Sequence, residues 1–226
     1  MRFQNVTFAY PGSKHPILRN FNLEVSSGEK VALLGMSGSG KTTAMKLLVG
    51  MYPPPAVGTI EVDRIRVENI DNRHLRAKVN YVNQRTQLFN KSILENIKYG
   101  NPRLKEKKII ETLQTYQLDA VFDKLKNGIH TNAGVHGGNL SLGMQKVTML
   151  LRGLYKPAKI VILDEPLAGL DAKTRDKIMS FIMDMCADKT LLIITHDQEV
   201  IPHMDRVVNL SKPKTASSPT IPDKRG

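Results

Sequence analysis

The chain has 226 residues, 41% of them hydrophobic and 24% charged, which suits one sizeable α/β domain with a single large core and would be cramped for two independent domains. The formal net charge of +12 would suit nucleic acid or an anionic membrane surface, but the basic residues are scattered and no aromatic stripe accompanies them, so charge alone does not indicate such a partner. The single cysteine, Cys186, excludes an internal disulfide, and its apolar neighbours predict a buried thiol in a reducing, cytosolic setting.

The first predicted elements are strands in which apolar and polar residues alternate. They cover residues 3–8 and 21–25, and a third strand of the same kind covers residues 59–62, after a Pro-rich loop at residues 53–55. Such alternation is typical of antiparallel strands that bury one face. We therefore expect these strands to pack together at one edge of the domain.

A phosphate-binding motif follows the apolar strand predicted at residues 30–34 and precedes a helix predicted at residues 43–49. Residues 35–42 fit the pattern G-x-x-x-x-G-K-[ST]. Glycines let the backbone fold around phosphate oxygens, and successive N–H groups point inward at the positive end of a helix. Lys41 is expected to contact the β and γ phosphates, and Thr42 to offer its hydroxyl to Mg²⁺. The predicted nucleotide-binding residues of this segment are Gly35, Ser37, Gly38, Ser39, Gly40, Lys41, Thr42 and Thr43.

Between about residues 84 and 157 the apolar pattern has helical periods and predicts no strand. We expect a helical subdomain that is inserted into the connections of the sheet, within one domain that covers residues 1–210. In one of its helices Ile109, Leu113 and Tyr116 should face inward, with the neighbouring basic residues in solvent. Residues 211–226 are basic and rich in Ser, Pro and Thr, which predicts a disordered tail.

Two carboxylates, Asp164 and Glu165, end an apolar strand predicted at residues 160–163. Isolated buried carboxylates are costly, and the carboxyl edge of a parallel sheet faces the same crevice as the phosphate loop. Asp164 is therefore predicted to hold Mg²⁺, directly or through water, and Glu165 to accept a proton from the attacking water. His196 ends the next strand, residues 190–195; a lone histidine is often structural, but this position favours contact with the γ-phosphate.

The apolar strands at residues 30–34, 160–163 and 190–195 predict a parallel sheet covered on both faces, because helical patterns separate them. The longest apolar runs have the length of strands and fall far short of the roughly 20 residues that a membrane helix needs. The N-terminus shows no charged-then-apolar signal. We expect any membrane contact to pass through another polypeptide or a removed segment.

With these motifs in this order, the chain resembles the nucleotide-binding domain of the ABC transporter family over about residues 1–210. The resemblance implies an α/β P-loop NTPase, the ABC cassette, with a parallel core sheet, an antiparallel β edge subdomain and a helical subdomain. It implies that Tyr10 stacks on adenine, although a core aromatic is the alternative. It also implies that Gln84 reaches Mg²⁺ and the attacking water, and that Asp171 lies in the loop that crosses the dimer interface.

Two segments, residues 88–97 and 137–141, look like the corresponding segments of exporters in the family. The chain also departs from the family's sequence pattern at two places. The signature, normally L-S-G-G-Q, has Leu142 for the first Gly and Met144 for the Gln. In the family this segment caps the γ-phosphate held by the opposite subunit, which implies that Ser141 and Gly143 bind nucleotide. Leu142 keeps the backbone N–H that would donate a hydrogen bond. Its branched side chain, however, fills space where the glycine of the family has only a hydrogen atom. Val135 stands where exporters usually have the Glu of a stretch that touches the membrane domain.

The resemblance implies an ATPase that binds ATP and Mg²⁺ and powers transport across a membrane as the nucleotide-binding domain of an exporter-type ABC transporter. Catalysis would use Glu165 as base and His196 as γ-phosphate sensor, together with Gln84 and Lys41. The metal site would consist of Thr42, Gln84 and Asp164.

The implied partners are a transmembrane domain or subunit, which would hold the chain at the cytoplasmic face of a membrane, and a second ABC domain in a head-to-tail dimer. The signature departures allow that second domain to be non-identical. Two alternatives stay open: a soluble ABC ATPase that acts on nucleic acid or ribosomes, and a regulatory ATP-binding module that barely hydrolyses. The first usually has two cassettes or a long coiled-coil insertion, and neither is visible in the sequence.

Overall fold

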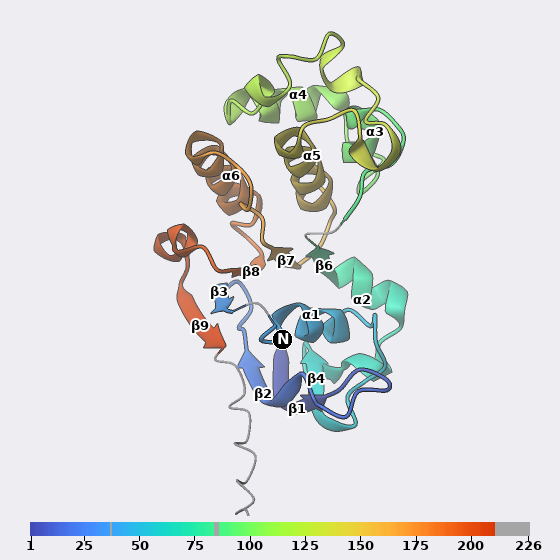
Figure 1. The fold of residues 1–226 in the computed structure, drawn as a ribbon, viewed down its shortest axis with the longest axis vertical. Coiled ribbons are helices and arrows are strands. Elements are labelled where there is room, and N and C mark those ends of the chain that lie inside the picture. Colours follow the sequence, from blue (N-terminus) through green and yellow to red (C-terminus); the bar gives the residue numbers. More distant parts are fainter. Residues whose placement is uncertain (37, 84–85, 211–226) are drawn as a thin grey trace, which may run out of the picture.

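Two sheets form the framework of the chain in the computed structural model, which describes residues 1–36, 38–83 and 86–210 (Figure 1). Within these ranges one sheet is antiparallel, with the order β2-β1-β4-β5, and the other is parallel, with the order β6-β7-β8-β3-β9. The strands are β1 (Arg2–Phe8), β2 (Leu18–Glu24), β3 (Lys30–Gly35), β4 (Val57–Val62), β5 (Ile65–Arg66), β6 (Val79–Val82), β7 (Ile160–Asp164), β8 (Thr190–Thr195) and β9 (Arg206–Leu210).

Alternate residues of the parallel strands face two separate cores. In β3, Val31 and Leu33 pack on the side of the antiparallel sheet, whereas Ala32 and Leu34 pack on the opposite side. The residues of β7 and β8 divide between the two cores in the same way. A strand buried on both faces has no position for a polar side chain, which explains the uninterrupted apolar runs in the sequence. The predicted parallel sheet, covered on both faces, is confirmed.

The helices cover the parallel sheet from both sides (Figure 1). Helix α1 (Lys41–Leu48) lies between the two sheets and buries Ala44, Met45, Leu47 and Leu48. Helix α2 (Asn72–Lys78) begins at Asp71, whose carboxylate accepts hydrogen bonds from two backbone N–H groups of the first turn and thereby caps the helix. Four helices gather on the other side of the sheet: α3 (Ile93–Lys98), α4 (Glu106–Thr115), α5 (Leu142–Leu154) and α6 (Ala172–Met185).

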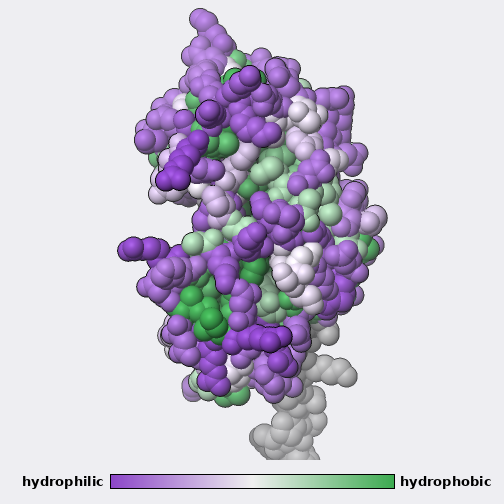
Figure 2. Space-filling model, turned by 180° about the vertical axis from the view of Figure 1, so that it is seen from behind, coloured by the Kyte–Doolittle hydropathy of each residue, from purple (hydrophilic) through white to green (hydrophobic). Residues whose placement is uncertain are grey.

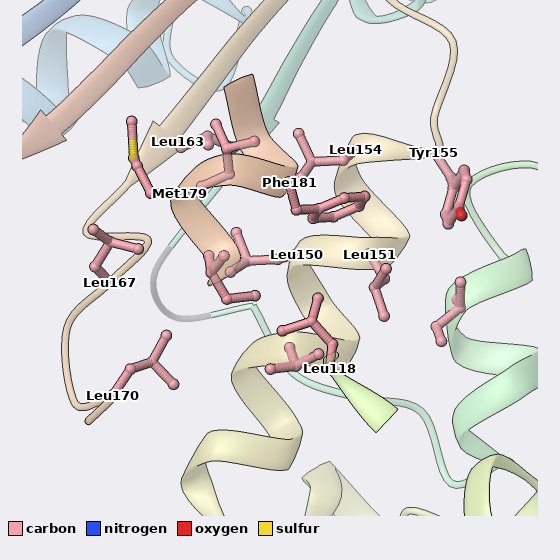
Figure 3. Close-up of a cluster of buried hydrophobic side chains, with 14 of the residues drawn as sticks. Leu118, Leu150, Leu151, Leu154, Tyr155, Leu163, Leu167, Leu170, Met179 and Phe181 are labelled. Carbon is pink, nitrogen blue, oxygen red and sulfur yellow. The ribbon is translucent and has the colours of Figure 1, made fainter. Parts of the chain in front are cut away.

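Helix α5 joins this helical part to the sheet through large apolar side chains. Figure 3 shows Leu150 and Leu154 of α5 close to Phe181 of α6, and all three are buried. They belong to the same cluster as Leu163 of β7. Burial of an aliphatic or aromatic side chain of this size stabilises a fold by about 1.5 to 3 kcal/mol, so α5 is a firmly seated element.

The structure agrees with most predicted elements, moves the start of one strand and adds elements that were not predicted, among them α2, β5 and β9. Strand β2 begins at Leu18, before the predicted start at residue 21, because Leu18 pairs with Phe8 of β1. Strand β9 was not predicted: it extends the parallel sheet beside β3, but it is only half buried and its apolar pattern is short. Residues 86–157 form helices and turns with one isolated bridge, from Ser92 to Asn132. The predicted burial of Cys186 is confirmed.

The surface seen from behind is largely hydrophilic, with smaller hydrophobic areas, and it is indented on one side (Figure 2). No helix in the described part of the chain combines the length and the apolarity that crossing a bilayer would require. The predicted tail, residues 211–226, lies outside the described residues. The large hydrophobic side chains exposed to solvent are Met36, Met51, Val57, Ile65, Phe89, Tyr99, Ile110, Val135 and Leu142.

Candidate active site

A pocket of about 630 Å³ opens at the carboxyl ends of β3, β7 and β8, where the segment from β3 to α1 faces the ends of the other two strands. Parallel strands present their carboxyl ends at one edge of a sheet, which is why residues far apart in the sequence meet here. The pocket is lined by Tyr10, Ile17, Gly35, Gly38, Ser39, Gly40, Lys41, Thr42, Thr43, Asp164, Glu165 and His196.

The described part of the phosphate loop owes its shape to glycine. Gly40 has a φ of +92°, and a Cβ at this position would lie 2.5 Å from Cδ2 of Leu18. Gly38 has a φ of +81° with nothing within 4 Å of a Cβ position, so its backbone borders open space. L side chains rarely adopt such angles, whereas glycine does so freely. The loop therefore presents bare backbone to the pocket, and its position before α1 suits an anion.

Lys41 is the first residue of α1, directly after this loop. Its Nζ donates to the carbonyl oxygens of Gly35 and Met36, at 2.5 and 3.0 Å, and lies 3.3 Å from Oγ of Ser39. Burial lowers the pKa of Lys41 from its ordinary value, and the carboxylates of Glu165 and Asp164 act in the opposite direction. The side chain thus supplies a point charge beside the loop, as phosphate binding requires.

The oxygen atoms of Thr42 and Asp164 form a pair at the base of the pocket. Thr42 Oγ1 donates to Asp164 Oδ2 at 3.0 Å, and the hydroxyl of Tyr81 donates to the same oxygen at 2.7 Å. Mg²⁺ prefers oxygen ligands and is usually held by one or two protein groups together with phosphate oxygens. A hydroxyl and a carboxylate within 3.0 Å of each other fit such an ion.

Tyr81 is a site residue that the sequence did not reveal. It lies in β6, opposite Ile162 of β7, and this pairing brings its phenol to Asp164. Burial, followed by the adjacent carboxylate, raises the pKa of Tyr81 well above its ordinary value, so the phenol stays protonated and donates. The register of β6 against β7, which brings the phenol of Tyr81 to Asp164, could not be predicted from the sequence.

Glu165 is held in a strained conformation at the end of β7. Its φ is +51°, in the left-handed region that is unfavourable for any residue with a side chain and costs on the order of 1 to 3 kcal/mol. Three contacts hold it: its N–H donates to Ile194 O at 2.8 Å, Thr195 Oγ1 donates to Oε2 at 3.0 Å, and His196 Nδ1 lies 2.9 Å from Oε1. The carboxylate is therefore fixed at the wall of the pocket.

Lys146 is a second residue that the sequence did not reveal. Its Nζ donates to the backbone carbonyl of Glu165 at 2.6 Å from helix α5. Burial lowers the pKa of Lys146, while Glu165 and Asp164 raise it. Lys146 follows the signature segment in the sequence, but nothing in the pattern indicates that a residue of α5 reaches the end of β7.

Tyr10 lies at the border of the pocket and also packs among other aromatic residues. Its hydroxyl lies 2.6 Å from Oγ1 of Thr43, and its ring borders the pocket. The same ring packs against Phe8 and Tyr52, with centroids 5.6 and 5.4 Å away. Neighbouring aromatic residues fix the orientation of the ring, which remains available for stacking with a flat ligand.

The remaining predicted residues lie apart from this pocket or outside the described chain. Ser141, Gly143 and Asp171 line a different pocket, of about 490 Å³. Ser141 and Asp171 cap the helices α5 and α6 through their side chains. Ser37 and Gln84 lie outside the described residues.

The two signature departures differ in their surroundings. Leu142 is the first residue of α5, and 77% of it is exposed. Met144 is buried with 7% exposed and belongs to the helical core. Met144 therefore replaces a polar residue of the family by one that packs inside. Leu142 instead places an apolar side chain on the surface, and its neighbours in the sequence, Ser141 and Gly143, line the second pocket.

Comparison with known proteins adds three findings. The family model described as ABC transporter matches residues 18–168. The chain is 32% identical over 216 residues to the ATP-dependent lipid A-core flippase of Chromobacterium violaceum, and the match covers 96% of this chain and 37% of the relative. It is 36% identical over 192 residues to the ABC transporter ATM1 of Plasmodium falciparum, and this match covers 85% of this chain and 18% of the relative. A solved structure, a bacterial Atm1-family ABC exporter with ATP bound, is similar with a TM-score of 0.85 and 30% identity over 93% of this chain and 36% of that one. The chain thus spans well under half the length of each.

Proposed function

We propose, since this chain belongs to the ABC transporter family, that it is the ATP-binding and ATP-hydrolysing domain of an exporter-type transporter. The observation that carries the proposal is a single pocket that contains Lys41, Thr42, Asp164, Glu165 and His196. Relatives named as a flippase and as an Atm1-family exporter support the exporter assignment over a soluble ATPase that acts on nucleic acid or ribosomes.

In this proposal the main polar side chains of the pocket have defined roles. The loop N–H groups and Lys41 hold the phosphates, and Tyr10 stacks on the adenine. Mg²⁺, held by Thr42 and Asp164 and by Gln84, would neutralise charge on the phosphate oxygens. Glu165 accepts a proton from the attacking water, because its carboxylate is fixed at the pocket wall.

His196 lies beside Glu165 and is 76% exposed at its side chain. Its Nδ1 lies 2.9 Å from a Glu165 carboxylate oxygen, which only accepts, so Nδ1 carries the proton of that contact. In this proposal the ring is doubly protonated, and its Nε2–H donates to a γ-phosphate oxygen. A donor fixed where negative charge develops stabilises the transition state. We therefore assign to His196 the role of γ-phosphate sensor.

The proposed partners follow from the second pocket. Ser141, Gly143 and Asp171 lie away from the chain's own phosphate loop, at the starts of α5 and α6. Helix N-termini attract anions, so these residues suit the nucleotide of an opposing cassette in a head-to-tail dimer. Transport also requires a transmembrane domain or subunit, which would place the chain at the cytoplasmic face of a membrane.

Titration of the purified chain with a fluorescent ATP analogue and Mg²⁺, together with phosphate release from ATP, tests this proposal. The wild type should bind at micromolar to millimolar concentration. Lys41→Ala should lower the affinity by about 10- to 100-fold, because it removes a charge-assisted contact to phosphate. Equal affinities of the two proteins would refute the assignment. Stimulation of hydrolysis by RNA or DNA would instead favour the soluble alternative.

We further propose that the opposing cassette is a non-identical chain. The residues of the chain's own half-site are all of the expected type, whereas the part lent to the opposite site is altered at Leu142. In a homodimer both sites would carry this exposed leucine, while a partner with the usual signature would complete the site that contains Lys41 and Glu165. The buried Met144 side chain does not face that site.

The rate of ATP hydrolysis, measured against protein concentration, tests whether the opposing cassette is a non-identical chain. Leu142→Gly should raise the rate of the homodimer, and mixing the wild type with a cassette that has the usual signature should raise it as well. The glycine variant is better than a double replacement, because Met144→Gln would bury an amide in the helical core. A wild-type homodimer that already hydrolyses ATP as fast as Leu142→Gly would rule out the need for a non-identical partner. Absence of hydrolysis in the wild type, the variant and the mixture would support the regulatory alternative.

A further inference from the structure

Lys146 reaches the proposed base from the helical side of the parallel sheet. It lies in the second turn of α5, half-buried, and its Nζ donates to the backbone oxygen of Glu165 at 2.6 Å. A backbone N–H from Ala168 approaches the same oxygen at the longer distance of 3.4 Å. The ammonium group is thus the closer partner of this carbonyl.

This contact acts on a backbone that would relax without support. Glu165 has a φ of +51°, and left-handed residues with a side chain persist only where their surroundings hold them. Ile194, Thr195 and His196 hold its N–H and its carboxylate from β8 and the segment that follows. Lys146 of α5 binds the carbonyl of Glu165, so hydrogen bonds from both the sheet and α5 hold this residue.

We propose that Lys146 is a positioning residue that keeps the backbone of Glu165 in the turn that aims its carboxylate into the pocket. The inference rests on the function proposed above, in which Glu165 is the base. A lysine ammonium has three donors and forms a charge-assisted bond to the carbonyl, which suits it to this role. Lys146 itself touches neither phosphate nor water in this proposal.

Lys146→Met removes the donor and keeps a flexible side chain of similar length. We expect kcat to fall by about 10- to 100-fold, because a displacement of a reacting group by about 1 Å has an effect of this size. The affinity for ATP should change by less than about twofold, since the phosphate loop is untouched. Lys146→Arg should recover part of kcat, because arginine restores a charged donor.

A matched control is available in the same region. Lys156 follows α5, and its Nζ donates to the backbone oxygen of Arg76 at 2.9 Å. Lys156→Met therefore removes the same kind of bond between residues that do not line the pocket, and it should leave kcat within about twofold of the wild type. Thermal unfolding of all variants shows whether a lower rate reflects misfolding; a poorly folded methionine variant is replaced in the comparison by Lys146→Gln.

A double-mutant cycle separates positioning from a general structural effect. If Lys146 acts through Glu165, then Lys146→Met should add no further loss in a Glu165→Gln background, as measured by single-turnover hydrolysis over long incubation. Additive losses, or a kcat of Lys146→Met equal to that of the wild type, would overturn the inference. A wild type that does not hydrolyse ATP would instead refute the proposed function, so the two failures are distinguishable.

Discussion

Tyr81 shows how one hydroxyl group can order the proposed Mg²⁺ site. It donates to the Asp164 oxygen that also accepts from Thr42, so the carboxylate has little freedom to rotate. Groups that orient metal ligands typically change metal affinity by about 10- to 100-fold when removed. Tyr81→Phe should accordingly raise the Mg²⁺ concentration for half-maximal hydrolysis about tenfold, while binding of ATP without Mg²⁺ stays unchanged.

Tyr116→Phe is the control for this variant, because Tyr116 donates to Asp184 at 2.6 Å in a similar pair outside the pocket. Titration of Mn²⁺ by electron paramagnetic resonance, with ATP present, gives a readout that does not depend on turnover. If Tyr81→Phe and Tyr116→Phe bind the metal equally well, Tyr81 does not orient Asp164.

Cys186 provides a simple check of the packing around α6. Burial raises the pKa of this thiol to about 11, and the thiolate is the reactive form. At pH 8 the folded chain should therefore react with a thiol reagent far more slowly than the chain unfolded in urea, whose thiol has its ordinary pKa. Equal rates in the two states would show that the thiol is accessible.

At the scale of elements, α5 approaches β6 more closely than any side chain would permit. A Cβ on Gly153 would lie 2.4 Å from Cγ2 of Val82, and Asn80 Nδ2 donates to the Gly153 carbonyl at 2.7 Å. Valine has a restricted χ1 and cannot easily turn away. Alanine normally favours a helix by up to about 1 kcal/mol over glycine, but overpacking here should cost about 1 to 3 kcal/mol.

Urea unfolding should consequently show Gly153→Ala to be less stable than the wild type. Gly143, in the first turn of the same helix, is the comparison, because the nearest atoms to its Cβ position are 4.0 Å away. Gly143→Ala should be neutral or stabilising. A stabilised Gly153→Ala would mean that α5 and β6 are not in close contact.

The parts of the site that follow strand ends could be predicted from the sequence. Apolar runs separated by helical patterns indicated parallel strands, whose carboxyl ends lie at one edge of the sheet. This was enough to predict that Lys41, Asp164 and His196 lie close together, as they do in the pocket. Tyr81 and Lys146 could not be predicted, because their roles depend on strand register and on how α5 is placed against β7. Strand β9 was missed since an edge strand buries too little to show a clear pattern.

At the scale of the whole molecule, the parallel sheet and the helical part carry different pockets. The pocket lies at the edge of the parallel sheet, and the starts of α5 and α6 line a second surface. This division suits two chains that each complete the other's site. The relatives are roughly three or more times longer than the match, so the transmembrane part of the proposed transporter would lie outside the matched region.

The most direct test of the account is the replacement Glu165→Gln, which removes the proposed base while keeping its shape. ATP binding should stay within about twofold of the wild type, and steady-state hydrolysis should fall by about 10² to 10⁴-fold, the loss expected for a positioned general base. Glu111→Gln, on the exposed side of α4, is the control and should change neither quantity. Steady-state hydrolysis by Glu165→Gln at the wild-type rate would contradict the account.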